Sequence, residues 1–210
     1  GTGKLTEVFL NLGCTVYAVE PNGPMRSAAE QALGGRSGFV SIDGQAENTG
    51  LQDGTADLVA VGQAFHWFDR DRARTEFSRI LRPDGAVAVV WNERGTDAGF
   101  GAAYAGIVRK YKTGEGEPVN YRSVTPEILE AFFAPNTPRW ARFPHRQRLD
   151  RDGARARMLS SSYMPGTGRE AEAMLAALDA AFDRHAADGM VEIGCEAVMC
   201  YGLLPGRECL

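Results

Sequence analysis

The chain has 210 residues, of which 44% are hydrophobic and 24% are charged, a composition typical of a globular protein. Its net charge is −4, from 23 basic and 27 acidic residues, which argues against a duplex nucleic acid as partner but leaves RNA open. No apolar stretch of about 18 residues is present to span a bilayer. The four cysteines form no CxxC pair and no histidine cluster accompanies them, so we expect no metal site and reduced thiols in a cytoplasmic protein.

Helical and strand patterns alternate through the first half of the chain. Apolar residues three and four positions apart predict a helix over 2–12, which Gly13 ends. The apolar run 15–19 predicts a strand of a sheet that is buried on both faces. Further helices are predicted over 24–33 and 71–81, strands over 38–42, 57–61 and 86–91, and a turn over 82–85. Strands separated by helices indicate a parallel sheet with right-handed crossovers, so the predicted fold class is α/β.

The second half of the chain is less regular. A glycine-rich and polar segment, 92–101, separates it from the alternating part. Helices are predicted over 102–112, 125–133, 154–162 and 170–185, and strands over 140–147 and 196–204. No internal repeat is present.

The chain opens with the glycine segment, residues 1–4, which reads Gly-Thr-Gly-Lys at the start of the first predicted helix. Glycines let the backbone approach a ligand closely, and a helix N-terminus offers unpaired N–H groups. A phosphate-binding P-loop would need Ser or Thr directly after Gly-Lys, where this chain has Leu5. A dinucleotide-binding loop would need a third glycine near position 6, where this chain has Thr6. An NAD(P)-dependent oxidoreductase nevertheless stays open as an alternative.

An acidic residue, Glu20, follows the predicted strand over 15–19 and precedes Pro21. A carboxylate in this place can accept hydrogen bonds from the two hydroxyls of a ribose. The alternative is an exposed acidic residue in a turn. Together with the glycine segment, Glu20 favours a nucleotide-binding site.

Five segments, taken in order, resemble the class I S-adenosylmethionine-dependent methyltransferases of the type 11 group, which includes ubiquinone-biosynthesis and trans-aconitate methyltransferase relatives. They are Gly-Thr-Gly at 1–3, Val-Glu-Pro-Asn at 19–22 with Met25, Gly-Gln-Ala-Glu at 44–47 with Leu51, Gln-Ala-Phe-His-Trp-Phe-Asp at 63–69, and Phe-Ser-Arg-Ile-Leu-Arg-Pro-Asp-Gly at 77–85. The segment 63–69 is the most distinctive, and the order and spacing of all five strengthen the likeness. The resemblance covers about residues 1–95.

This resemblance implies a Rossmann-like three-layer sandwich. Its sheet would have seven mostly parallel strands in the order 3-2-1-4-5-7-6, with strand seven antiparallel. The first strand and the first part of its motif are missing from the chain, so we expect a gap between strands two and four. Unpaired strand edges inside a sheet are costly, and we therefore expect the chain to hold its cofactor poorly.

The resemblance also implies S-adenosylmethionine as the cofactor. Gly1 and Gly3 would lie against its methionine part, Glu20 would bind the ribose, and Ala46 with Glu47 would flank the adenine. The full set of implied cofactor-binding residues is Gly1, Thr2, Gly3, Glu20, Pro21, Met25, Gln45, Ala46, Glu47, Gln63, Ala64 and Phe65.

The acceptor side of the implied site is less defined. Trp67 and Phe68 would form walls of the substrate pocket, and His66 would be the candidate general base. From their positions alone, four residues of the second half are further candidates for the acceptor pocket: Asn92, Tyr104, Ser161 and Tyr163. Packing or solvent-exposed roles are the alternative for each of these residues.

We therefore expect a methyltransferase that acts on a small-molecule acceptor. Residues 1–95 would form the cofactor-binding core, and residues 96–210 a helical lid or substrate-side region with the last two strands of the same sheet. The absence of a strong base does not argue against this activity, because aligning the acceptor with the methyl group supplies much of the rate of methyl transfer. A nucleotide-binding protein without catalysis and an RNA methyltransferase also stay open.

Overall fold

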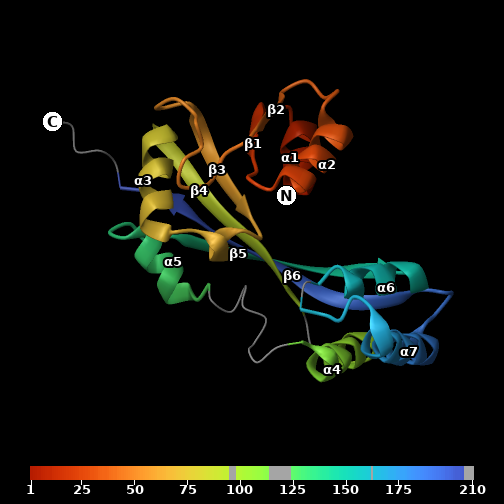
Figure 1. The fold of residues 1–210 in the computed structure, drawn as a ribbon. Helices are drawn as coiled ribbons and strands as arrows, with labels where there is room; N and C mark the ends of the chain where they lie inside the picture. The colour runs from red at the N-terminus through yellow and green to blue at the C-terminus, as the bar shows by residue number, and fades with distance from the viewer. Residues whose placement is uncertain (95–97, 114–123, 162, 206–210) are drawn as a thin grey trace. The chain divides into compact units, whose positions relative to one another are not determined.

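The computed structural model describes residues 1–94, 98–113, 124–161 and 163–205, and its architecture is α/β, as predicted (Figure 1). The elements in chain order are α1 (Lys4–Asn11), β1 (Val16–Val19), α2 (Gly23–Leu33), β2 (Phe39–Ile42), β3 (Ala56–Gly62), the 3-10 helix η1 (Phe65–Trp67), α3 (Arg70–Ile80), β4 (Leu81–Arg94), α4 (Phe100–Tyr111), α5 (Pro126–Phe133), β5 (Arg139–Leu149), α6 (Arg151–Leu159), α7 (Gly168–His185) and β6 (Val191–Leu203). None of the described helices combines the length and the apolar character that a membrane span requires.

Side-chain caps fix where the helices nearest the candidate site begin. The Asn22 side chain accepts a hydrogen bond from the Met25 N–H at 3.1 Å, and Pro24 stands in the first turn of α2. The Asp69 side chain accepts one from the Arg72 N–H at 3.2 Å and so begins α3. Asn22 lies just after the end of β1 and Asp69 lies just after η1, so each cap also fixes the residues that lead into its helix.

The described strands form two sheets. β1 and β2 pair in parallel, with Val16 opposite Phe39 and Val19 opposite Ile42. The second sheet has the order β3-β4-β6-β5, in which β3 and β4 are parallel and the far end is antiparallel. Within each sheet the neighbours agree with the expected order 3-2-1-4-5-7-6: β1 and β2 correspond to strands two and three, and β3-β4-β6-β5 to strands four, five, seven and six. Between β1 and β3 there is no pairing among the described residues; that this reflects a missing first strand stays a prediction.

Two strands, β4 and β6, begin five residues earlier than predicted. β4 begins at Leu81 because this residue pairs with Ala56, and the register then jumps so that Leu58 pairs with Ala86. The predicted turn over 82–85 thus lies inside the bounds of β4 as an irregularity. β6 begins at Val191, five residues before the predicted start.

The chain divides into two compact units. The first unit comprises residues 1–90, 124–140 and 200–210, and the second comprises 91–123 and 141–199. In the second unit α7 packs against α4 and α6, and fully buried side chains such as Met158, Met174 and Leu178 fill its core. The predicted division at residue 95 into a cofactor-binding core and a substrate-side region concerns function, and it stays a prediction.

The small parallel sheet is not buried on both faces, contrary to the expectation from the apolar run 15–19. Tyr17 of β1 is 41% exposed and Val40 of β2 is 40% exposed. Helices α1 and α2 contact this sheet, yet these two side chains stay partly in solvent. On α1 itself, Leu10 is buried, whereas Val8 and Leu12 of the apolar pattern are exposed.

Candidate functional site

The candidate site lies in the first unit, at the carboxyl ends of β1, β2 and β3. These strands end at Val19, Ile42 and Gly62, and each is followed by one of the segments singled out from the sequence. Ligands of open α/β sheets bind at this edge, outside the carboxyl ends of parallel strands.

Glu20 is fixed at the end of β1 through both its backbone and its side chain. Its N–H donates to the Ile42 carbonyl at 3.1 Å, and its carbonyl accepts from Arg26 Nη1 at 2.7 Å. Its Oε1 accepts from the Asn22 N–H at 2.7 Å, and its Oε2 lies beside the backbone nitrogen of Gly1. The structure therefore brings together the acidic residue and the glycine segment.

Arg26 is a supporting residue that sequence analysis missed. Besides the Glu20 carbonyl, its guanidinium donates to both carboxylate oxygens of Asp43, each at 3.0 Å. Asp43 directly follows β2, so this bidentate ion pair joins the ends of β1 and β2. Asp43 is 17 positions away from Arg26, and no sequence pattern links the two.

Gly3 is required by the packing of α1 on α2. Its φ is +85°, and a Cβ at this position would lie 2.6 Å from Leu33 Cδ1 and 3.3 Å from Ala29 Cβ of α2. A side chain at Gly1 would instead meet open space. The close approach of α1 to α2 thus explains Gly3, whereas Gly1 and the exposed Thr2 are open to a ligand.

Replacing Gly3 by alanine should lower the free energy of unfolding by about 1–2 kcal/mol, because alanine disfavours a positive φ and its methyl group would press on Leu33 and Ala29. Urea-induced unfolding followed by circular dichroism measures the change. The matched control is Gly1→Ala, which should not change the midpoint of urea-induced unfolding. Equal stabilities for the two variants would contradict the packing explanation.

The segment 44–49 contains a tight turn beside the end of β1. Gln45 and Asn48 exchange N–H to carbonyl hydrogen bonds, both 3.1 Å long. A Cβ at Gly44 would lie 3.1 Å from Val19 Cγ1, so the segment packs directly on the last residue of β1. The turn thus lies next to the residue that precedes Glu20.

Glu47 connects this turn to the start of α3. Its Oε1 accepts a hydrogen bond from the Asp69 N–H at 2.8 Å. Both Glu47 and its neighbour Ala46 are half-buried, while Gln45 is exposed. The structure therefore brings the segment 44–49 to the end of the segment 63–69, and a role for Ala46 and Glu47 beside an adenine stays a prediction. Pro21 and Met25 are exposed.

Gln63 has a strained backbone directly after β3. Its φ is +55°, and its N–H donates to the Val90 carbonyl at 2.9 Å. Positive φ is uncommon outside glycine, costs about 1–3 kcal/mol, and concentrates at functional sites. A Cβ at the preceding Gly62 would lie 2.9 Å from Leu5 Cδ2, which places α1 against this strand end.

Replacing Gln63 by glycine should raise the free energy of unfolding by about 0.5 kcal/mol, because relief of the strained φ outweighs the entropy that a glycine adds to the unfolded chain. The opposite sign is expected for Gln31→Gly in the last turn of α2, which should cost up to about 1 kcal/mol. Thermal unfolding of the two variants gives the comparison. Destabilisation by both would show that the backbone of Gln63 is not strained.

The aromatic residues of the segment 63–69 have different surroundings. Phe65 is 2% exposed. The centroid of its ring lies 5.0 Å from that of Phe132 and 6.0 Å from that of Phe68. Phe68 is half-buried and also contacts the Phe77 ring at 6.2 Å. Phe65 is thus a core residue of the first unit, while Ala64 beside it is half-buried.

His66 and Trp67 lie on the outer side of η1. Trp67 is 72% exposed, and the centroid of its ring lies 4.9 Å from the centroid of the half-buried His66 ring. Burial lowers the pKa of His66 below its usual value of about 6.5, so the imidazole is neutral at pH 7. A neutral imidazole can accept a proton, which general-base catalysis requires.

The four acceptor-pocket candidates from the second half all lie in the second unit: Asn92, Tyr104, Ser161 and Tyr163. Tyr104 is buried in the core of that unit, whereas Asn92 is exposed. The Tyr163 carbonyl accepts hydrogen bonds from the N–H and the hydroxyl of Thr113, at 2.9 and 3.2 Å. A substrate-binding role for these residues stays a prediction.

Comparisons with known proteins match the part of the chain that contains the segments of this site. A family model for a methyltransferase domain matches residues 1–89, which contain the glycine segment, Glu20 and the segments 44–49 and 63–69. Uncharacterized methyltransferases of Mycobacterium bovis and Mycobacterium tuberculosis are each 38% identical over 127 residues, which is 60% of this chain and 49% of theirs. The chain thus spans about half the length of these curated relatives.

Solved structures show the same fold. A candidate type II methyltransferase from Anaeromyxobacter dehalogenans is similar with a TM-score of 0.71 at 21% identity, over 98% of this chain and 87% of that one. A candidate methyltransferase from an antibiotic biosynthesis pathway of Anabaena variabilis gives 0.61 at 21% identity, over 97% and 87%. Residues 1–89 therefore match the methyltransferase domain family, and the chain has the Rossmann-like α/β fold of these structural neighbours.

Proposed function

We propose that this chain binds S-adenosylmethionine and forms part of an enzyme that transfers its methyl group to a small-molecule acceptor. The observation that carries the proposal is the convergence of Glu20, Gly1 and the segment 44–49 at one sheet edge. These residues lie in the part of the chain that matches the family model for a methyltransferase domain.

The residues at this edge have the chemistry that such a cofactor needs. A carboxylate at Glu20 can accept hydrogen bonds from both ribose hydroxyls. Gly1 would lie against the methionine part of the cofactor in this proposal. The turn of the segment 44–49 carries Ala46 and Glu47, which would lie beside the adenine in this proposal. Arg26 would keep Glu20 in place, because it holds the Glu20 carbonyl and Asp43 together.

When bound, the cofactor supplies a methyl group on a sulfonium, which is a good leaving group. The protein then contributes mainly by holding the acceptor in line and by excluding water. The exposed Trp67 and the half-buried Phe68 are proposed as walls of the acceptor pocket. His66, neutral at pH 7, would accept the proton of an acceptor that must lose one. Unchanged turnover in a His66→Ala variant would exclude this base role.

The proposal is tested by calorimetric titration of S-adenosylhomocysteine, the product form of the cofactor. We would titrate the 210-residue chain and, beside it, a form extended by one β-strand upstream of Gly1. Micromolar binding to the extended form alone would support both the cofactor and the expected absence of the first strand.

Two results would contradict the proposal. The first is an absence of binding to both forms. The second is stabilisation by NAD(P) rather than by S-adenosylhomocysteine, which would favour the oxidoreductase alternative. If S-adenosylhomocysteine binds but no acceptor is methylated, the alternative of a nucleotide-binding protein without catalysis would be favoured.

A further inference from the structure

A buried carboxylate on α3 holds the segment 44–49 in place. Glu76 is 8% exposed and Thr49 is 4% exposed, and these are the buried polar or charged residues of the described part of the chain. A carboxylate is seldom buried unless its oxygens are paired. The contacts of Glu76 therefore indicate what this burial achieves.

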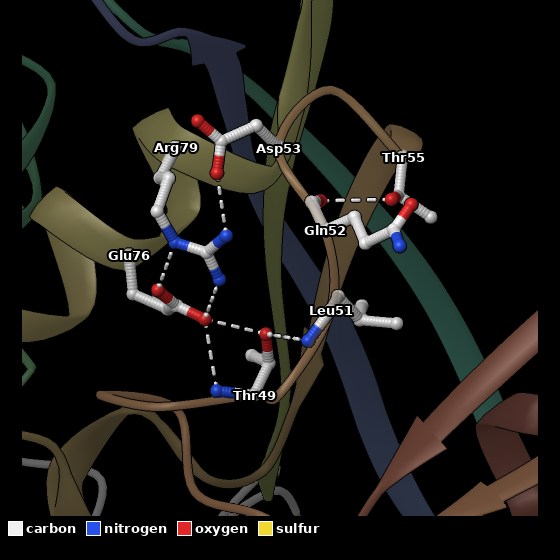
Figure 2. Close-up of polar contacts among 7 residues, drawn as sticks. All are labelled: Thr49, Leu51, Gln52, Asp53, Thr55, Glu76 and Arg79. Atoms are coloured by element: carbon white, nitrogen blue, oxygen red, sulfur yellow. Dashed lines mark hydrogen bonds and ion pairs between the residues drawn. The ribbon is translucent and has the colours of Figure 1, made fainter.

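Both carboxylate oxygens of Glu76 accept hydrogen bonds, as Figure 2 shows. Oε1 accepts from the Thr49 N–H at 2.9 Å, from the Thr49 hydroxyl at 2.5 Å and from Arg79 Nη2 at 2.7 Å. Oε2 accepts from Arg79 Nε at 2.8 Å. Arg79 Nη1 in turn donates to Asp53 at 2.7 Å. The network thus joins one turn of α3 to Thr49 and to Asp53, four residues further along the same connection.

This network attaches the segment 44–49 to α3 at a second point. The first is the hydrogen bond from the Asp69 N–H to Glu47. The two attachment points on the segment, Glu47 and Thr49, are two residues apart, and they enclose the last residue of the Gln45–Asn48 turn. A connection between two strands is thus held rigidly before any ligand binds, which reduces the entropy that binding would otherwise cost.

We infer that Glu76 is a positioning residue that fixes the segment 44–49 for the adenine ring of the cofactor. The inference rests on the proposed function, which places Ala46 and Glu47 beside the adenine. Glu76 acts through Thr49 and does not itself touch the cofactor. Glutamine has the same shape, but its amide group would present a donor to the donors of Arg79 or Thr49, so Glu76→Gln should release the segment.

The test compares two ligands that differ in the adenine. S-adenosylhomocysteine contains it, and S-ribosylhomocysteine lacks it. The Glu76→Gln variant should bind S-adenosylhomocysteine about tenfold more weakly and bind S-ribosylhomocysteine with unchanged affinity. Titrations use the form of the protein that binds S-adenosylhomocysteine, at a temperature where circular dichroism shows every variant to be folded.

Two further sets of variants make the result specific. Glu172→Gln removes the same charge from an exposed position on α7 and should change neither affinity. Thr49→Val removes one donor to Glu76 and should weaken S-adenosylhomocysteine binding, whereas Thr49→Ser keeps the hydroxyl and should preserve it.

The outcomes separate this inference from the proposed function. Equal binding of S-adenosylhomocysteine by wild type and Glu76→Gln would overturn the inference and leave the proposed function standing. An equal loss for both ligands would mean that Glu76 supports the whole fold rather than the adenine side, and it would overturn the inference too. If the wild type binds neither ligand, the proposed function and the inference fail together.

Discussion

Replacing Glu76 by glutamine should lower the free energy of unfolding by about 3 kcal/mol at pH 7. The Arg79 guanidinium, with further hydrogen bonds from Thr49, holds the pKa of Glu76 at about 2, against an ordinary value of 4.5, although burial acts in the opposite direction. At about 1.4 kcal/mol per pH unit, the difference between these two pKa values corresponds to about 3 kcal/mol of folding stability.

This stabilisation depends on pH in a defined direction. The pKa of Glu76 is lower in the folded than in the unfolded chain, so the contribution is complete above about pH 4.5. It declines as the pH falls from 4.5 and is lost below about pH 2. The difference in stability between wild type and Glu76→Gln should therefore shrink as the solution is acidified.

Urea-induced unfolding at pH 7, 5, 4 and 3, followed by circular dichroism, measures this difference. Because both proteins share every other carboxylate, the subtraction removes their common acid sensitivity. Glu172→Gln, at an exposed position, should give a difference close to zero at every pH. A Glu76→Gln difference that stays constant between pH 5 and pH 3 would contradict the low pKa of this carboxyl.

Replacing Glu20 by alanine should weaken S-adenosylhomocysteine binding by about 1–3 kcal/mol, because two ribose hydroxyls would lose a charged acceptor. Glu20→Gln, which keeps one acceptor oxygen, should give an intermediate loss. Isothermal titration calorimetry at pH 7 measures both values. Turnover with a saturating cofactor concentration should change less than the affinity does.

The control for Glu20 is a nearby acidic residue with the same charge. Glu7 lies in the first turn of α1 and is exposed, so Glu7→Ala tests the effect of charge alone. An unchanged affinity is expected for this variant. If Glu7→Ala and Glu20→Ala weaken binding equally, the effect of Glu20 is electrostatic and its assignment to the ribose is wrong.

Local sequence signals predicted most of the elements. Helices α2 and α3 were placed within one residue of their observed starts, because Pro24 and Asp69 mark those starts locally. The early start of β4 could not be read in the same way. It depends on the pairing of Leu81 with Ala56, a contact between residues that are distant in the sequence.

The candidate site shows the same limit. Glu20 and the glycine segment were recognisable by residue type and spacing, and the structure places them in contact. Arg26 and Glu76 were not recognised as supporting residues, because their partners Asp43 and Thr49 lie 17 and 27 positions away. The spacing of Glu76 and Arg79 on one helix face is visible in the sequence, but such pairs are common on exposed helices.

Burial cannot be read from residue type alone either. Phe65 and Trp67 are both aromatic and only two positions apart, yet Phe65 is 2% exposed and Trp67 is 72% exposed. The 3-10 turn between them directs one ring toward Phe132 and leaves the other in solvent. The sequence predicted a pocket wall of both Trp67 and Phe68, and that role stays a prediction for each of them.

The buried Glu76 network also restricts how this domain can diverge in evolution. Loss of Arg79 alone would leave the buried carboxylate without its counter-charge, and loss of Thr49 would remove the hydroxyl that donates to it, both of which are unfavourable. Replacement of the whole set by well-packed apolar side chains can instead be neutral. Substitutions at positions 49, 76 and 79 should therefore be correlated among homologues. Single changes should be rare, and an intermediate on the way from one set to the other would pass through a destabilised protein.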